Sequence, residues 1–208
     1  MGIPSQESSG VDSIEGLVQT VIQTLLKSRQ TLSFAESCTG GMLSARMAEV
    51  SGVSAIYMGS VVSYSNEAKV EILGVGLSSL QSQGAVSQIV AQEMAQGVRH
   101  RFHTDWGVSI TGIAGPTGGS VEKPVGTVWI AVSGLSLANG IGGRPGVGPD
   151  RTDSKQKELG SSERSKLSES FLEARKYFFK GDRKQIQVQS VQAALELLME
   201  GLNKVGAP

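Results

Sequence analysis

The sequence of 208 residues is poor in cysteine and histidine and has no excess of either charge. Cys38 is its only cysteine, so no disulfide can form within the chain, and we expect a reducing compartment. Lysines and arginines number 19, and aspartates and glutamates also number 19. The chain therefore has no net field that would attract nucleic acid, and we expect no direct nucleic-acid partner.

The sequence also lacks a membrane span and a secretion signal. No apolar run approaches the roughly 20 residues that a helix needs to cross a bilayer. Residues 1–7 lack the basic and then apolar order of a signal peptide, and Gln6 stands where an acylation motif requires Ser or Thr. We expect a soluble cytoplasmic protein without a membrane partner, or an organellar one if a transit peptide was removed.

The length of the chain suits one domain with a full hydrophobic core. Residues 1–10 are polar and small, which predicts a disordered tail. Residues 134–170 are rich in Gly, Ser and mixed charges without apolar periodicity, which predicts a flexible insertion in a hairpin connection. We expect a single domain over residues 11–208 that this insertion interrupts, and a role of the insertion as a lid or partner-binding loop stays open.

Helical and strand patterns alternate along the chain. Asp12 and Glu15 form a candidate capping box before an amphipathic stretch, and further helices are expected over residues 40–50 and after Ser65, Ser87 and Asp182. Short apolar or β-branched runs predict strands over residues 31–35, 59–64, 106–112 and 124–133, with 171–179 as an antiparallel partner. This order favours a layered α/β domain with a largely parallel sheet and helices on both faces.

Two glycine-containing segments follow predicted strands. Residues 35–41, A-E-S-C-T-G-G, lead into a helix, whose first amides attract anions and whose glycines allow a ligand to come close. On these residues alone, Ser37 or Thr39 could equally be a helix cap. Residues 112–120, G-I-A-G-P-T-G-G-S, match neither a Walker A loop nor a G-x-G-x-x-G fingerprint, and a plain turn is the alternative there.

A serine nucleophile needs a base, and the sequence offers few. His100 and His103 lie near the end of a helix and should face solvent; their spacing could seat a metal, but no third ligand is apparent and we expect none. A lysine can act as base only if burial or a nearby cation lowers its pKa from about 10.4. Lys69 is the candidate base. It lies one turn into a short helix that follows a strand expected beside the one ending at Ala35, which would bring it towards Ser37. The alternative is a lysine on the solvated face of that helix.

Four segments in this order resemble the CinA C-terminal domain family, whose characterised members are nicotinamide-nucleotide amidohydrolases, also called nicotinamide mononucleotide deamidases. They are residues 35–41 (A-E-S-C-T-G-G), 64–69 (Y-S-N-E-A-K), 84–87 (G-A-V-S) and 109–129, which contains S-I-T-G-I-A-G-P-T-G-G-S and E-K-P-V-G-T-V-W. The likeness resumes at residues 179–183, F-K-G-D-R, and the insertion departs from the family. The chain is similar to the stand-alone form, without the molybdopterin-binding-like domain.

The resemblance implies a three-layer α/β/α fold with one mixed sheet and a Ser37/Lys69 catalytic pair. Tyr64 would orient Lys69 or relay a proton, or else pack on the core. Cys38 is expected to be structural, although a cysteine nucleophile is conceivable at a helix start. Backbone amides around residues 38–41 would stabilise an oxyanion.

The resemblance also implies a nucleotide site, without a metal or an organic cofactor. Glu36 would hold the loop or contact the ribose, and Lys123 could offer charge. The expected substrate-binding residues are Glu36, Thr39, Gly40, Gly41, Thr111, Gly112, Gly115, Gly119 and Ser120.

The expected activity is hydrolysis of nicotinamide mononucleotide to nicotinate mononucleotide and ammonia, which returns it to pyridine-nucleotide synthesis and so serves NAD salvage. Two alternatives stay open. The chain could be a non-catalytic nucleotide- or protein-binding module of this competence- and damage-associated family, or an amidase for another pyridine nucleotide amide. We expect a homo-oligomer, since small layered domains usually carry exposed apolar faces.

Overall fold

The computed structural model describes residues 13–134 and 171–205, so the predicted tail and almost all of the predicted insertion lie outside the described residues. The helices are α1 (Ile14–Ser28), α2 (Met42–Ala48), α3 (Asn66–Leu73), α4 (Leu77–Gln83), α5 (Gln88–Phe102) and α6 (Arg183–Val205), with a short 3₁₀ turn at Val53–Ala55. The strands are β1 (Leu32–Glu36), β2 (Tyr57–Val62), β3 (Trp106–Gly112), β4 (Thr127–Gly134) and β5 (Phe171–Phe178).

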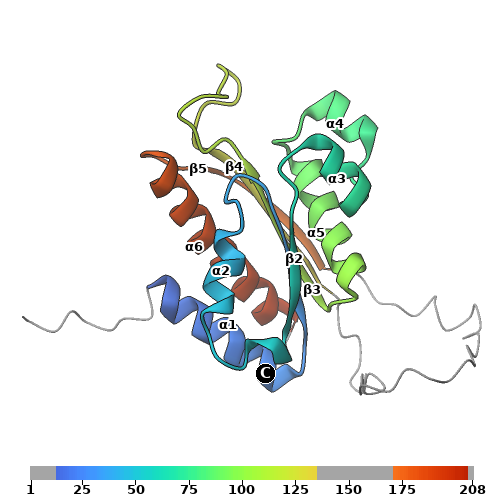
Figure 1. Cartoon of the computed structure of the whole chain (residues 1–208), viewed down its shortest axis with the longest axis vertical. Helices are drawn as coiled ribbons and strands as arrows, with labels where there is room; N and C mark the ends of the chain where they lie inside the picture. Colours follow the sequence, from blue (N-terminus) through green and yellow to red (C-terminus); the bar gives the residue numbers. More distant parts are fainter. Residues whose placement is uncertain (1–12, 135–170, 206–208) are drawn as a thin grey trace, which may run out of the picture.

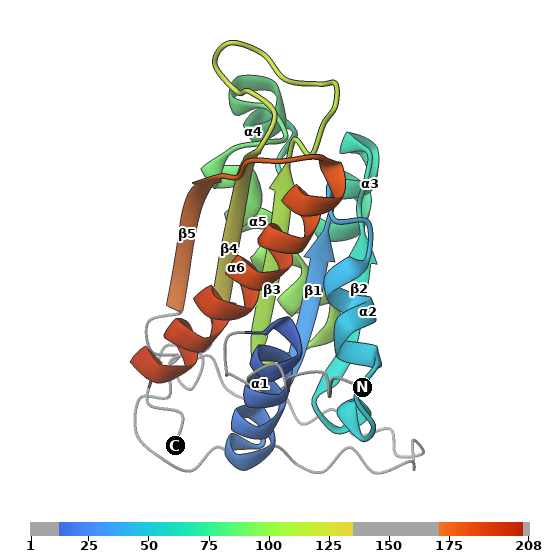
Figure 2. The same cartoon turned by 90° about the vertical axis from the view of Figure 1, so that its left-hand side faces the viewer.

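The five strands form one mixed sheet in the order β2-β1-β3-β4-β5. Strand β1 pairs in parallel with β2 and β3, whereas β4 is antiparallel to both β3 and β5. Every strand except β4 therefore runs in the same direction, as Figure 2 shows for β1 and β3. The predicted mixed, largely parallel sheet is confirmed, and the carboxyl ends of β1, β2 and β3 lie at one edge of it.

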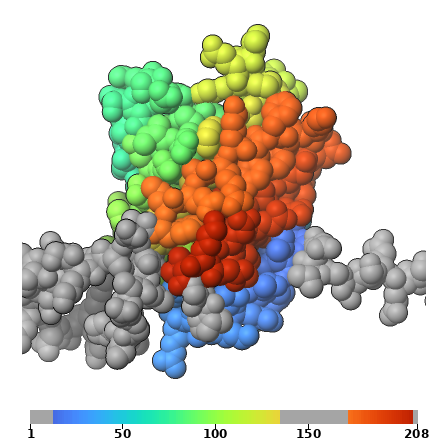
Figure 3. Space-filling view, turned by 180° about the vertical axis from the view of Figure 1, so that it is seen from behind, coloured from blue at the N-terminus to red at the C-terminus, as the bar shows by residue number. Residues whose placement is uncertain are grey.

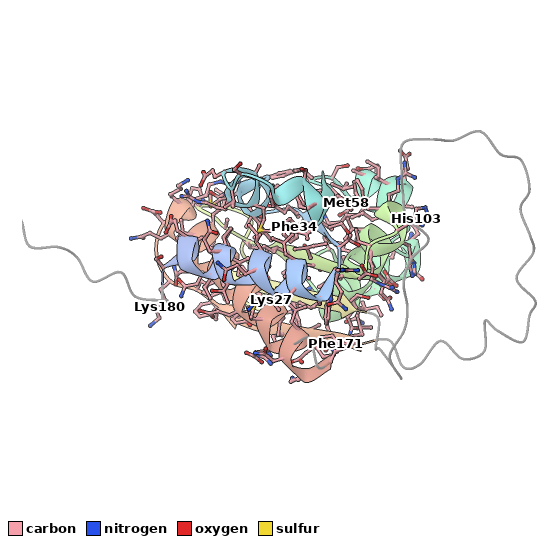
Figure 4. All side chains as sticks on the ribbon, turned by 90° about the horizontal axis from the view of Figure 1, so that it is seen from below. Lys27, Phe34, Met58, His103, Phe171 and Lys180 are labelled. Atoms are coloured by element: carbon pink, nitrogen blue, oxygen red, sulfur yellow. The ribbon has the colours of Figure 1, made fainter. Side chains whose placement is uncertain are left out.

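Helices cover both faces of the sheet and complete the predicted three layers. Helices α1, α2 and α6 lie on one face, and α3, α4 and α5 lie on the other (Figure 1). Seen from behind, β5 and α6 cover the middle of the molecule and α1 lies below them (Figure 3). The main core lies between the sheet and the α1, α2 and α6 layer, where Phe34 of β1 is fully buried (Figure 4).

One local expectation was wrong, and one helix was missed. Helix α1 is capped by Ser13, whose hydroxyl accepts a hydrogen bond from Gly16 N at 3.1 Å, and not by Asp12. Helix α4 was not expected, because its sequence L-S-S-L-Q-S-Q is rich in serine and buries only Leu80. Among the described helices, none combines the length and the apolar character that a membrane span requires.

Helix α5 approaches α3 closely at a single glycine. A Cβ atom built on Gly97 would lie 1.9 Å from the backbone oxygen of Leu73, the last residue of α3. No real Cβ atom tolerates such a contact, so any side chain at position 97 would force the two helices apart. Gly97 therefore fixes how closely α3 packs against α5.

We expect Gly97→Ala to destabilise the protein, although alanine favours a helix interior over glycine by about 1 kcal/mol. Overpacking against a backbone atom should cost more, about 1–3 kcal/mol, and lower Tm. Thermal unfolding checks this, with Gly76→Ala as the control because a Cβ there meets only the ends of the Ser79 and Glu93 side chains. A Gly97→Ala protein as stable as wild type would contradict the close approach.

Candidate active site

Ser37 opens the turn between β1 and α2, which we call the serine turn (residues 37–41). The Ser37 amide donates to Ile110 O of the adjacent strand β3 at 3.0 Å, which extends the sheet pairing by one residue. Ser37 has 9% of its surface exposed. The sheet therefore places this hydroxyl at the carboxyl edge of the parallel strands, where α/β folds open their clefts.

The carboxylate of Glu36 holds the serine turn against α2. It is fully buried and accepts hydrogen bonds from the amides of Gly41 (3.1 Å), Leu43 (3.1 Å) and Ser44 (2.9 Å), and from the Ser44 hydroxyl (2.5 Å). These donors lie at the start of α2, where a negative charge is also favoured by the helix dipole. Of the two roles left open for Glu36, the geometry supports holding the loop and leaves no accessible oxygen for a ribose.

Lys69 reaches Ser37 from the neighbouring strand connection. Its helix α3 begins after Ser65, whose hydroxyl accepts from Ala68 N at 3.1 Å as the sequence predicts. Lys69 is only 1% exposed, and its Nζ lies 2.6 Å from Ser63 O and 3.1 Å from Ser37 Oγ. The parallel pairing of β1 with β2 produces this meeting, because Ser37 and Ser63 follow paired strand ends.

Burial sets the protonation of the groups around Ser37. Desolvation lowers the pKa of the Lys69 amine, against a smaller opposing effect of Cys38. Desolvation likewise raises the pKa of the Cys38 thiol to about 12, so the thiol is protonated at neutral pH. Lys69 Nζ donates to Ser63 O and to Ser37 Oγ. A lysine that has lost its proton can instead accept the Ser37 proton across the same contact. The arrangement suits proton transfer from Ser37 to Lys69.

A cleft of about 240 Å³ opens in front of this pair. Six of the predicted site residues line it, namely Ser37, Tyr64, Lys69, Thr111, Gly112 and Gly115. The other lining residues are Cys38, Ala85, Val86, Ile113, Ala114, Thr117, Gly118 and Arg183. A larger hollow of about 550 Å³ lies between α3 and α5 and contains none of the predicted residues.

Most backbone groups of the serine turn are already paired. Gly40 N donates to Ser37 O at 3.1 Å, Gly41 N donates to Glu36, and Met42 N donates to Thr39 O at 3.2 Å. Within residues 13–134 and 171–205, the amides of Cys38 and Thr39 have no oxygen acceptor. Since buried amides are rarely left unpaired, these two are the donors available to an oxyanion.

Comparison with known proteins identifies the family. The model of the CinA C-terminal domain matches residues 14–140, more than half of the chain. This chain belongs to the CinA C-terminal domain family. It is 54% identical over 112 residues to a CinA-like protein of Fervidobacterium nodosum, covering 54% of this chain and 28% of that protein. A CinA-like protein of Synechococcus is 50% identical over 118 residues, covering 57% of this chain and 28% of that protein.

Solved structures of CinA-type proteins share the fold. The competence/damage inducible protein of Agrobacterium tumefaciens is 31% identical, covers 95% of this chain and 99% of its own, and superposes with a TM-score of 0.72. The competence damage-inducible protein A of Klebsiella pneumoniae is 28% identical, with 92% and 98% coverage and a TM-score of 0.72. This chain spans little more than a quarter of the curated relatives above.

Several residues predicted from the CinA resemblance do not line the cleft. Thr39, Gly40 and Gly41 lie outside it, and the two glycine amides hold the turn together. Gly119 and Ser120 also lie outside, in a turn closed by Ser120 N to Lys123 O (2.9 Å) and by Lys123 N to Ser120 Oγ (3.0 Å). The Lys123 amine donates to Gln83 O at 2.6 Å. This end of the second glycine-rich segment, residues 112–120, is therefore a plain turn, which was the alternative to a nucleotide-binding loop.

Tyr64 and Arg183 form a contact at the cleft that the sequence did not reveal. Tyr64 is 62% exposed, and its hydroxyl accepts from an Arg183 Nη at 2.9 Å. The other Nη of Arg183 donates to Gly115 O at 2.8 Å. Tyr64 thus neither packs on the core nor, in the described part of the chain, bonds to Lys69. Arg183 was missed, although it belongs to the segment at residues 179–183 with which the CinA likeness resumes before the final helix.

The two histidines face solvent, as expected. Both are exposed, and His103 lies at the edge of the domain (Figure 4). No group of three or more His, Cys, Asp or Glu side chains that could hold a metal ion occurs within the described ranges.

We expect the buried amine of Lys69 to make stability depend on pH. Because its pKa is lowered in the folded state, the unfolded chain binds more protons between that value and about 10.4. The Tm of wild type should therefore rise relative to that of Lys69→Met as the pH increases from about 7 to about 10. Thermal unfolding across this range checks the trend.

The matched control is Lys27→Met, which changes an exposed lysine of α1 in the same way. The Tm of wild type relative to that of Lys69→Met could instead stay constant or fall as the pH increases. Either result would show that the amine is not held neutral.

Proposed function

We propose that this chain is an amidohydrolase that converts nicotinamide mononucleotide and water to nicotinate mononucleotide and ammonia through a serine acyl-enzyme. The observation that carries the proposal is the buried Lys69 amine, 3.1 Å from the Ser37 hydroxyl at the wall of a cleft. The CinA family resemblance supplies the substrate class. A serine activated by an adjacent base is the arrangement that nucleophilic amide hydrolysis requires.

In the first step, Ser37 Oγ attacks the carboxamide carbon and its proton passes to Lys69 Nζ. A C–O bond forms, the C=O bond becomes a single bond, and negative charge develops on its oxygen. The amide of Cys38, which lines the cleft, and the amide of Thr39, which follows directly although its residue is not part of the lining, are the donors proposed to stabilise this oxyanion. Donors fixed in place before the reaction are effective because they need no reorganisation as charge develops.

In the second step, the tetrahedral intermediate collapses and the C–N bond breaks. Lys69 returns its proton to the departing nitrogen, which leaves as ammonia, and an ester to Ser37 remains. Water then attacks the ester while Lys69 again takes a proton. Lys69 passes this proton to Ser37 Oγ as the C–O bond to Ser37 breaks, and the product acid loses its own proton to solvent and leaves as the carboxylate. Lys69 acts as base and acid in turn, which suits an amine whose pKa is lowered by burial.

The lining of the cleft supports a small charged aromatic nucleotide as the substrate. Its apolar lining residues Ala85, Val86, Ile113 and Ala114 suit a flat pyridine ring. Arg183 and Lys69 are the basic residues of the lining; with Lys69 acting as the base, Arg183 is the group proposed to offset the charge of a phosphate. The hydrogen bonds of Arg183 to Tyr64 and Gly115 hold its guanidinium in place for this contact.

We expect the wild-type protein to release ammonia and nicotinate mononucleotide from nicotinamide mononucleotide, with and without a chelator. Ser37→Ala removes the nucleophile and Lys69→Ala the base, so each should lower kcat by at least about a thousandfold. Cys38→Ala should retain activity because its thiol is protonated. Coupled ammonia detection and chromatography of the nucleotide product measure all four proteins.

Parallel assays with nicotinamide and nicotinamide riboside show whether the phosphate is needed. Activity on these and not on the nucleotide would replace the proposed substrate with another pyridine amide. A folded wild type that hydrolyses none of them would instead support the binding-module alternative. Activity lost in Cys38→Ala but kept in Ser37→Ala would overturn the serine mechanism.

The pH dependence of kcat tests the role of Lys69. Only the neutral amine can accept the Ser37 proton, so kcat should fall as the pH drops below the lowered pKa of Lys69. Steady-state rates at saturating substrate measure this acid limb, and Lys27→Met should leave it in place. A rate that stays flat with falling pH while the protein remains folded would exclude Lys69 as the base.

A further inference from the structure

The serine turn is bonded to α6, a helix distant in the sequence that lies in the same layer as α2. Gln187 of α6 donates from Nε2 to Cys38 O at 2.8 Å, across 149 positions of sequence. The reversed amide orientation would place two oxygens against each other, so the donor assignment follows from the contact itself. Gln187 is half-buried, and it is not among the residues that line the cleft. No step of the proposed reaction uses it.

The bond from Gln187 holds the carbonyl of the peptide group that joins Cys38 to Thr39. The Ser37 and Thr39 carbonyls are paired with amides of the turn or the helix start. Cys38 O is instead held by a side chain from α6, and it belongs to the same peptide group as Thr39 N, one of the two amides without an oxygen acceptor in the described chain. Fixing the carbonyl of a planar peptide also fixes its N–H.

The direction of the bond agrees with a role at the reacting oxygen. The Cys38–Thr39 peptide is trans, so its N–H points opposite to its C=O. With Cys38 O directed at α6, the N–H of the same peptide is directed away from α6. Helix α3, which carries Lys69, lies on the other face of the sheet (Figure 1). A hydrogen bond accepted by the carbonyl also polarises the N–H of the same peptide.

We propose that Gln187 is a positioning residue that orients the Cys38–Thr39 peptide, so that Thr39 N–H stabilises the oxyanion formed when Ser37 attacks. The inference rests on the proposed function. Gly40 and Gly41 follow directly, both with positive φ (63° and 97°), and such glycines stiffen a turn little. The bond from Gln187 supplies stiffness that the local sequence lacks.

Gln187→Met keeps the length of the side chain and removes the donor. We expect kcat on nicotinamide mononucleotide to fall about tenfold, less than the hundredfold or more that follows complete loss of an oxyanion donor. KM should change less than about twofold, because the interaction strengthens only as negative charge develops. The acid limb of kcat should keep its position, since Lys69 and Ser37 are untouched.

Gln189→Met is the matched control. Gln189 lies two residues further along α6, and its Nε2 donates to Lys180 O at 2.8 Å, away from the serine turn. This change removes the same type of bond from the same helix, so kcat should stay at the wild-type value. Gln187→Glu is a second variant, whose carboxylate repels Cys38 O and should lower kcat at least as far as Gln187→Met does.

The outcomes separate the inference from the proposed function. A lowered kcat with unchanged KM in both Gln187 variants, with wild-type Tm and an active Gln189→Met, supports the positioning role. If the Gln187 variants keep the kcat of an active wild type, the inference is overturned and the proposed function is not. The same holds if Gln189→Met loses as much kcat as Gln187→Met, or if the acid limb of kcat shifts in the Gln187 variants. If Gln187→Met does not fold, the kcat and KM of Gln187→Glu decide whether Gln187 positions the peptide. A wild type that releases no ammonia overturns both.

Discussion

The site depends on one constraint, the burial of a lysine amine. Moving a charged ammonium out of water is so costly that a buried lysine either finds a partner charge or loses its proton. No carboxylate bonds to Lys69 in the described chain; its Nζ has a carbonyl at 2.6 Å and a hydroxyl at 3.1 Å. Both neighbours suit a neutral amine. The other features of the site serve to hold this amine beside Ser37.

The three layers contribute separately to that arrangement. The sheet supplies Ser37 and the Ser63 carbonyl from the ends of adjacent parallel strands, and α3 supplies Lys69 from one face. Helix α6 supplies Arg183 and Gln187 from the other face. Parallel strands bring their carboxyl ends to one edge, so groups from both faces can converge there without long loops. The antiparallel β4 and β5 widen the sheet that carries α6.

The sequence predicted the parts of the site that depend on local pattern. Ser37 and Lys69 each follow a strand within a few residues. Once β1 and β2 are expected to be neighbours, the two side chains are expected at the same edge of the sheet. Helix α4 was missed because its serine-rich sequence has one buried position. Arg183 and Gln187 were missed for a different reason. Their partners Tyr64 and Cys38 lie 119 and 149 positions away, and such contacts depend on how α6 packs, which no periodicity encodes.

The glycine amides show why a correct motif does not assign each of its atoms. All of the amides from residues 38 to 41 were expected to bind substrate or an oxyanion, yet a turn this tight must also satisfy its own backbone. Gly40 and Gly41 donate to Ser37 O and to Glu36, and those bonds close the turn. In the part of the chain that the structure describes, only the amides of Cys38 and Thr39 in this segment are left without an oxygen acceptor. Division of one short segment between folding and chemistry explains why Glu36, which takes no part in the proposed reaction, stands beside the serine that does.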